Sequence, residues 1–101
     1  LDLMMRNHKT EFFKKSLVNR SFEVILEFKS CKEILTKNGD KMLVGTVFDS
    51  KSELSCVIFP SSYQNISRII SLNVLYKAYG KLLYNDKKNS YEFQIERLTN
   101  M

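Results

Sequence analysis

From Phe22 onward, apolar side chains recur at every second position, a pattern typical of β-strands with one buried face. We expect a first strand from 22 to about 32 or 34, a second over 42–48, a third over 54–58, a fourth over 74–83 and a fifth over 91–96. Gly45 interrupts the second strand and indicates a bulge or a close backbone approach. The predicted core includes Leu26, Phe28, Ile58, Ala78 and Ile95, joined by the inward-phase residues Phe22, Val24, Leu54, Cys56, Val74, Tyr76, Leu82, Tyr84, Tyr91 and Phe93.

Polar segments separate these strands and predict where the chain turns. The segment 36–40 contains Asn38-Gly39, a pair that accepts positive φ in a tight hairpin. Turns are also expected over 49–52 and 85–89. Pro60 ends the third strand, and beyond it Tyr63, Ile66, Ile69 and Ile70 follow helical spacing, with Ser61 or Ser62 as the N-cap.

The order of the elements is three strands, one short helix and two strands, which is the order of the OB-fold, a five-stranded Greek-key barrel. An immunoglobulin-like sandwich needs about seven strands and no helix, and an SH3-like barrel has no such helix. We therefore predict an all-β OB-fold domain over 21–101. Residues 1–20 predict a linker helix with an apolar stripe of Met5, Phe12, Phe13 and Leu17.

Composition limits the class of protein further. The chain has 101 residues, the size of one domain, and 44% of them are hydrophobic. No run of eighteen apolar residues and no secretory signal pattern is present, and the start at Leu1 indicates a fragment of a longer protein. Cys31 and Cys56 lack partners at metal-ligand spacing, so we expect reduced, buried thiols and a cytoplasmic location.

Catalytic chemistry finds little support in the sequence. His8 is the single histidine and has no cysteine or carboxylate cluster around it. The three glycines are isolated, so they form no phosphate-binding loop. Asp40 and Asp49 lie at turns, where aspartate is common for local hydrogen bonding. We expect no catalytic residue, no metal and no cofactor in this chain.

Three segments carry a family resemblance. Thr36-Lys37-Asn38-Gly39-Asp40-Lys41-Met42 is similar to a Thr-Lys-x-Gly-x-x-Met motif, and Val57-Ile58-Phe59-Pro60-Ser61-Ser62-Tyr63 is similar to a Val-Phe-Pro-x-x-Tyr entry into a helix, with Ile58 in the place of valine. Asn73-Val74-Leu75 and Gly80-Lys81-Leu82 match a fourth strand with its glycine. Over about residues 22–98 the chain resembles the OB domain of bacterial DNA polymerase III alpha subunits, the C-family replicative polymerases. It departs from them at Ser52, where the family usually has glycine.

The resemblance implies that the parent chain is a DNA-directed DNA polymerase, a nucleotidyltransferase, whose metal-binding carboxylates belong to another domain. The OB domain would then assist DNA replication by holding single-stranded template near the polymerase. This chain alone would be inactive. Other polymerase domains, and replisome subunits, would be its protein partners, and no membrane partner is expected.

OB-folds bind nucleic acid on the face of the second and third strands, between the loops that join strands one to two and four to five. That chemistry needs cations for the phosphates and flat side chains for the bases. The candidate nucleic-acid-binding residues on these loops and strands are Lys37, Asn38, Lys41, Phe48, Lys77, Tyr79, Lys81, Lys87 and Lys88.

Each of these residues also has an ordinary structural explanation. A turn lysine is as often merely solvated, and Phe48 is about twice as often a core or helix contact as a stacking platform. Negative charge on the outer face of the first and fifth strands, from Glu23, Glu27, Glu92 and Glu96, repels phosphate. We therefore expect weak, salt-sensitive, sequence-independent binding of single-stranded DNA.

Two other functions fit the same fold. An anticodon-binding OB domain of a class II aminoacyl-tRNA synthetase should show several outward aromatic and polar side chains on strands one to three, and few are present. A protein-docking OB module of the replisome would use an apolar patch, for which Leu75 and Leu83 are candidates on the outward phase of the fourth strand.

Overall fold

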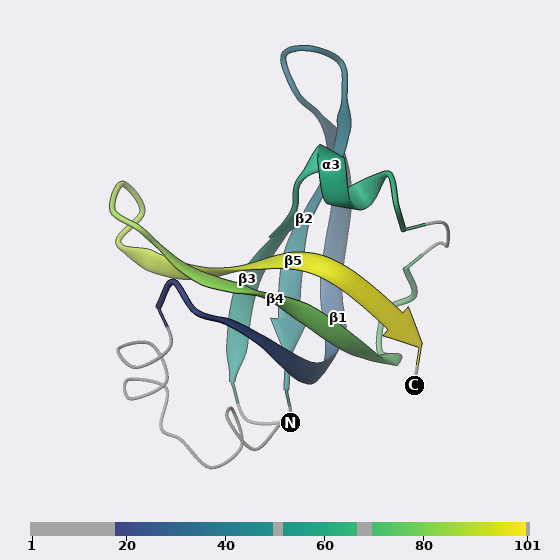
Figure 1. Cartoon of the computed structure of the whole chain (residues 1–101), viewed down its shortest axis with the longest axis vertical. Coiled ribbons are helices and arrows are strands. Elements are labelled where there is room, and N and C mark those ends of the chain that lie inside the picture. Colours follow the sequence, from purple (N-terminus) through teal and green to yellow (C-terminus); the bar gives the residue numbers. More distant parts are fainter. Residues whose placement is uncertain (1–17, 50–51, 67–69, 101) are drawn as a thin grey trace.

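The computed structural model of the chain describes residues 18–49, 52–66 and 70–100, and within them five strands close into a barrel (Figure 1). The strands follow one another around the barrel in the order β1-β2-β3-β5-β4. The element bounds are β1 Ser21–Leu35, β2 Lys41–Phe48, β3 Glu53–Ile58, α3 Pro60–Tyr63, β4 Leu75–Asn85 and β5 Ser90–Asn100. The predicted order of three strands, one helix and two strands is confirmed, and with it the five-stranded OB-fold barrel.

The helix between β3 and β4 is shorter than predicted. Helix α3 is a single turn whose N-cap is Phe59, so the expectation that Ser61 or Ser62 caps it was wrong. Pro60 both ends β3 and begins the helix, because a proline needs no N–H partner in the first turn. The side chain of Asn65 donates to the carbonyl of Ser61 (3.1 Å) in competition with the backbone, and Ile66 lies beyond the helix. Ile69 lies outside the described residues.

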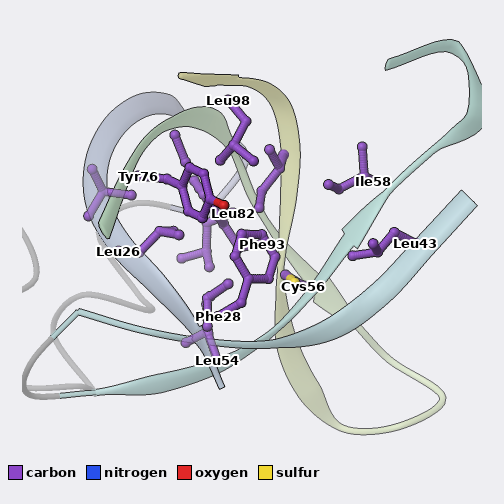
Figure 2. Close-up of a cluster of buried hydrophobic side chains, with 14 of the residues drawn as sticks. Leu26, Phe28, Leu43, Leu54, Cys56, Ile58, Tyr76, Leu82, Phe93 and Leu98 are labelled. Atoms are coloured by element: carbon purple, nitrogen blue, oxygen red, sulfur yellow. The ribbon is translucent and has the colours of Figure 1, made fainter. Parts of the chain in front are cut away.

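The core lies inside the barrel and matches the inward phase of the predicted strands. All five residues named for it are buried: Leu26, Phe28, Ile58, Ala78 and Ile95. Figure 2 shows side chains from several strands gathered in this cluster. The ring of Phe28 packs edge-on against Tyr76 with centroids 5.9 Å apart. The hydroxyl of the buried Tyr76 accepts the N–H of Ser71 at 2.9 Å, which satisfies the polar tip of that ring.

Two bulges change which side chains point inward. In β1, the pairing with β2 shifts between Phe28 and Ser30, so Cys31 packs against the core while Lys32 points outward. In β5, the pairing with β4 shifts beside Gly80, so Leu98 is buried and Arg97 exposed. Strict alternation from Phe28 or from Ile95 would place these side chains on the opposite faces.

Both glycines in the strands lie beside a bulge, at close backbone approaches. A Cβ at Gly45 would lie 2.2 Å from the carbonyl oxygen of Ser30, and one at Gly80 would lie 2.1 Å from that of Gln94. The prediction of a bulge or close approach at Gly45 is therefore confirmed.

Several side chains predicted to be buried are not. Val74 is exposed because β4 begins only at Leu75, and Tyr84 is 39% exposed because it lies at the end of β4 beyond the closed part of the barrel. Tyr91 is half-buried against the edge of the core. Leu75 and Leu83 do point outward, but eight residues of strand, about 26 Å, separate them, so they do not form one patch.

The expected linker helix over 1–20 lies almost wholly outside the described residues. The part that is described is not helical. Val18 forms a parallel bridge with Leu82, and the N–H of Asn19 donates to the carbonyl of Leu82 at 2.6 Å. Residues 18–20 thus run beside β4, and the division of the chain at residue 20 stays a prediction.

Candidate nucleic-acid interface

The β1–β2 loop, residues 36–40, projects beyond the end of the barrel (Figure 1). The N–H of Thr36 donates to the carbonyl of Asp40 at 2.8 Å, and the N–H of Asp40 donates to the Thr36 hydroxyl at 3.1 Å. Gly39 has a φ of 85°, which its lack of a Cβ permits. This closed turn presents the exposed Lys37 and Asn38 to solvent at its tip.

The β4–β5 loop, residues 86–89, is held by its own asparagines. The Asn85 side chain accepts the N–H of Lys88 at 3.1 Å, and Asn89 adopts a positive φ of 53°. The Tyr84 hydroxyl donates to the Asn89 side chain, and the Tyr84 ring packs on Tyr91 with centroids 4.8 Å apart. Both lysines of the loop, Lys87 and Lys88, are therefore exposed on a turn of defined shape.

The strand register aligns outward side chains in rows across the face between these loops. We name four rows, about 7 Å apart along each strand. The apolar row is Ile34, Met42 and Phe59; the lysine-ended row is Lys32, Val44, Val57, Gln94 and Lys81; the hydroxyl row is Ser30, Thr46, Ser55, Glu92 and Leu83; and the acidic row is Glu27, Phe48 and Glu53. Phe59 is assigned to the apolar row because it follows Ile58, which pairs with Leu43, in extended backbone.

The lysine-ended row carries no carboxylate. Val57 is buried on the outer side of β3, beside Val44 on β2 and Gln94 on β5. Glu92, half-buried at the β5 end, is the one carboxylate of the hydroxyl row. Between the loops, these two rows therefore present lysines, hydroxyls and apolar side chains and one carboxylate, and the loops themselves add Asp40 and Asp86 beside their lysines.

Phe48 points outward and lies in the acidic row, so it is neither a core residue nor a helix contact. It pairs across the strands with Glu27 and Glu53. The Lys29 ammonium lies 5.0 Å from the centre of its ring and 3.7 Å from the Glu27 carboxylate. A phosphate approaching Phe48 would meet two carboxylates whose nearest lysine is already engaged.

The three candidates on β4 are separated from the rest. Strand β4 pairs with β1 and β5 and not with β2 or β3, so strand β1 separates Lys77 and Tyr79 from Phe48: Glu27 of β1 pairs with Phe48 on one side and with Leu75 of β4 on the other. The guanidinium carbon of Arg97 lies 4.3 Å from the centre of the Tyr79 ring, so one face of that ring is covered. Lys81 reaches the interface only as the far end of the lysine-ended row.

Lys41 lies on the opposite face of the β1–β2 hairpin from Lys32. It shares the phase of the buried Leu43, and its ammonium lies 3.9 Å from the Glu33 carboxylate. With Pro60 and Tyr63 of α3, it lines a concavity of about 730 Å³. Burial, followed by the charge of Glu33, raises the pKa of Tyr63, which keeps its hydroxyl protonated beside that carboxylate. Lys41 therefore faces α3 and not the rows.

Sequence reasoning placed Lys29 and Lys32 just before the β1–β2 loop without counting them as site residues, and it missed Phe59 and Arg97 as members of the outer surface. Lys32 and Arg97 follow the bulges, where a period of two assigns the wrong face. Phe59 directly precedes Pro60, which predicts the start of a helix. The alternation from the buried Ile58 nevertheless already places Phe59 on the outer face. The expectation that Asp49 forms a local hydrogen bond within its turn is confirmed, because its side chain accepts the N–H of Ser52 at 2.8 Å. Ser52 does not adopt positive φ, so serine fits where the resembled family has glycine.

The described residues contain no group of three or more histidine, cysteine or carboxylate side chains placed to hold a metal ion. His8 lies outside them. No helix within the described ranges has the length and apolar character to cross a membrane.

The fold defines an OB-fold domain, and comparison with solved structures agrees. The single-stranded DNA-binding protein domain of a Synechococcus protein superimposes with a TM-score of 0.67 at 17% identity, covering 84% of this chain and 98% of that one. A mitochondrial single-stranded DNA-binding protein of S. cerevisiae superimposes with a TM-score of 0.61 at 10% identity, covering 82% of this chain and 99% of that one. A putative aspartyl-tRNA synthetase of Leishmania major superimposes with a TM-score of 0.62 at 8% identity, covering 97% of this chain and 20% of the synthetase.

Among proteins of known name, the chain is similar to the DNA polymerase III subunit alpha of Staphylococcus aureus, with 33% identity over 69 residues. The subunit of the same name from Staphylococcus epidermidis is 32% identical over 66 residues. The matches cover 68% and 65% of this chain, and in each case the chain spans about 6% of the relative's length. No family model matches the chain.

Proposed function

We propose that this chain is the OB domain of a bacterial DNA polymerase III alpha subunit and binds single-stranded DNA without sequence preference. The observation that carries the proposal is the carboxylate-free, lysine-ended row between the two lysine-bearing loops. Single-strand binding needs a cationic path for phosphates and sequence-tolerant contacts for bases, and this face offers both. The similarity to the staphylococcal alpha subunits supports the choice of parent.

In this proposal the domain is a binding module, and nucleotide transfer is carried out elsewhere in the parent polymerase. Lys32, Lys37, Lys87 and Lys88 contact phosphates along the path between the loops. Because these contacts are to the backbone, they read no sequence. The domain acts in the cytoplasm beside the other polymerase domains and steadies the template strand.

The anticodon-binding alternative draws on the structural likeness to the Leishmania synthetase. It requires several outward aromatic and polar readers on β1, β2 and β3, where the described strands offer the ring of Phe48 in the acidic row and the short hydroxyl side chains of the hydroxyl row. The docking alternative draws on Leu72, Val74 and Leu75, which are 43–51% exposed where β4 begins. Single-strand binding is favoured because the lysines and the row lie together.

The test is a titration of fluorescein-labelled oligothymidine and of oligouridine of equal length with the purified chain, followed by anisotropy at several salt concentrations. We expect binding to both, with an affinity that falls as salt rises by about 0.7 in log–log slope per phosphate contact. No binding at the lowest salt would overturn the proposal and favour docking. Strong preference for a particular RNA sequence would favour the anticodon alternative.

A further inference from the structure

Phe59 occupies an unusual position at the base of the β1–β2 loop. Its side chain is 39% exposed although its neighbour Ile58 is completely buried. It continues the apolar row formed with Ile34 and Met42, both half-buried on the outward side of β1 and β2. An aromatic ring thus lies on a small apolar surface that opens to solvent beside the lysine-ended row.

The backbone of Phe59 is held on both sides. Its φ of −70° and ψ of 159° are extended, and its carbonyl accepts the N–H groups of Ser62 at 3.0 Å and Tyr63 at 2.8 Å. Pro60 follows and restricts the chain further. Because β3 anchors one side and α3 the other, the ring is presented from a rigid junction. A rigid aromatic group loses little conformational entropy when a ligand packs on it.

The other outward aromatic residues in the described part of the chain are already engaged. Phe48 lies under Lys29 between two glutamates, Tyr79 lies under Arg97, and Tyr84 packs on Tyr91. Among the described residues, Phe59 has no ring or cation partner of this kind.

The charge around Phe59 suits an anionic chain with flat bases. Lys32 lies in the adjacent row on β1, and the loop that follows Leu35 carries the exposed Lys37 and, at its other end, the exposed Asp40. The acidic row lies three rows away, about 20 Å along the strands. A base on the ring would therefore place its phosphates within reach of two lysines and far from Glu27 and Glu53.

We infer that Phe59 is the stacking platform for one base of the bound single strand, with Met42 and Ile34 extending the apolar surface beneath it. This inference rests on the proposed function. Stacking of a base on an aromatic side chain typically changes affinity by about 5- to 150-fold on removal of the ring. It is tolerant of sequence, because every base presents a flat face.

Two measurements on oligothymidine test the inference. Phe59→Ala should weaken binding at least fivefold with no change in salt slope, whereas the matched Phe48→Ala should change affinity less than twofold. The chain contains no tryptophan, so Phe59→Trp supplies a single tryptophan, as does Phe48→Trp, and excitation beyond the tyrosine absorption band reports on that tryptophan alone. On addition of oligothymidine, stacking should quench the tryptophan fluorescence of Phe59→Trp and leave the tryptophan fluorescence of Phe48→Trp unchanged. The tryptophan pair keeps the test decisive even if Phe59→Ala perturbs folding.

The outcomes separate the two claims. If wild type binds and Phe59→Ala binds equally well, or Phe59→Trp is not quenched, the platform is wrong while the proposed function stands. If wild type binds no oligonucleotide, the proposed function fails and the platform fails with it. A wild type that binds no oligonucleotide but dimerises, with Phe59→Ala monomeric, would show instead that the apolar row is a protein interface.

Discussion

Gly45 on β2 lies so close to Ser30 on β1 that a Cβ at Gly45 would come within 2.2 Å of the Ser30 carbonyl oxygen and 2.9 Å of the Cα of Cys31. The contact lies directly beside the bulge that follows Phe28. That bulge directs Lys32 and Ile34 to the outer face and Cys31 to the core. The composition of the candidate interface therefore depends on a backbone contact that only glycine permits.

Gly45→Ala should lower the free energy of unfolding by about 3 kcal/mol, because the added methyl group meets backbone that cannot move aside without disturbing the β1–β2 ladder. Urea denaturation followed by circular dichroism measures the change. Gly39→Ala is the matched control: its φ of 85° costs about 1 kcal/mol for a residue with a Cβ, but the surrounding space is open. Equal losses in the two variants would contradict the close approach.

Cys56 should make the protein less stable at high pH. Burial, together with Cys31 and Glu92 nearby, raises the pKa of its thiol from 9.0 to about 12. Between those values the unfolded chain releases the proton and the folded chain keeps it. The free energy of unfolding therefore falls as pH rises from 9 towards 12, by up to about 1.4 kcal/mol per pH unit, and this contribution is fully present below pH 9.

Urea midpoints at pH 8 and pH 10.5 measure this effect. The Cys56→Ala variant is the control, since it starts from lower stability but lacks this titration. We expect a shallower decline in the variant than in wild type. Parallel declines would mean that the other alkaline groups account for the whole effect.

Leu98→Ala should cost about 2–4 kcal/mol, because Leu98 is buried by the β5 bulge and truncation leaves a cavity. Leu72→Ala removes the same atoms from a side chain that is 47% exposed and should cost less than about 1 kcal/mol. Thermal or urea unfolding of both variants gives the comparison. Similar costs would show that Leu98 is not a core residue.

Periodicity predicted the five strands and most of the core, because burial of one strand face is a local, repeated signal. Residues such as Leu26, Ala78 and Ile95 fall in stretches where the alternation is unbroken. This alternation fails at a β-bulge, where one strand carries an extra residue between two positions that pair with its neighbour. Lys32 and Leu98 each follow a bulge that depends on contact with a partner strand, and nothing within the strand's own sequence marks its position.

The candidate interface was predictable in its loops and less so in its strands. Lys37, Lys87 and Lys88 lie in polar turns whose exposure follows from composition. Tyr79 and Lys77 share the predicted outward face of the fourth strand, but the barrel order pairs β4 with β1 and β5 and not with β2 or β3. Lys41 is next to the β1–β2 loop in the sequence, but its phase along β2 directs it towards α3.

The two faces of the β1–β2 hairpin give the sharpest test of where a nucleic acid would run. Lys32 and Lys41 are both exposed and carry the same charge, but Lys32 points to the rows and Lys41 to the α3 side, within 3.9 Å of Glu33. Lys32→Ala should lower the log–log salt slope for oligothymidine by about 0.7, the loss of one phosphate contact, and weaken all sequences alike. Lys41→Ala should change it much less. Glu27→Gln on the acidic row should leave affinity unchanged or raise it, since it removes repulsion. The reverse pattern, with Lys41 dominant and Lys32 silent, would place the strand in the concavity beside Tyr63 and Pro60 instead of across β2 and β3.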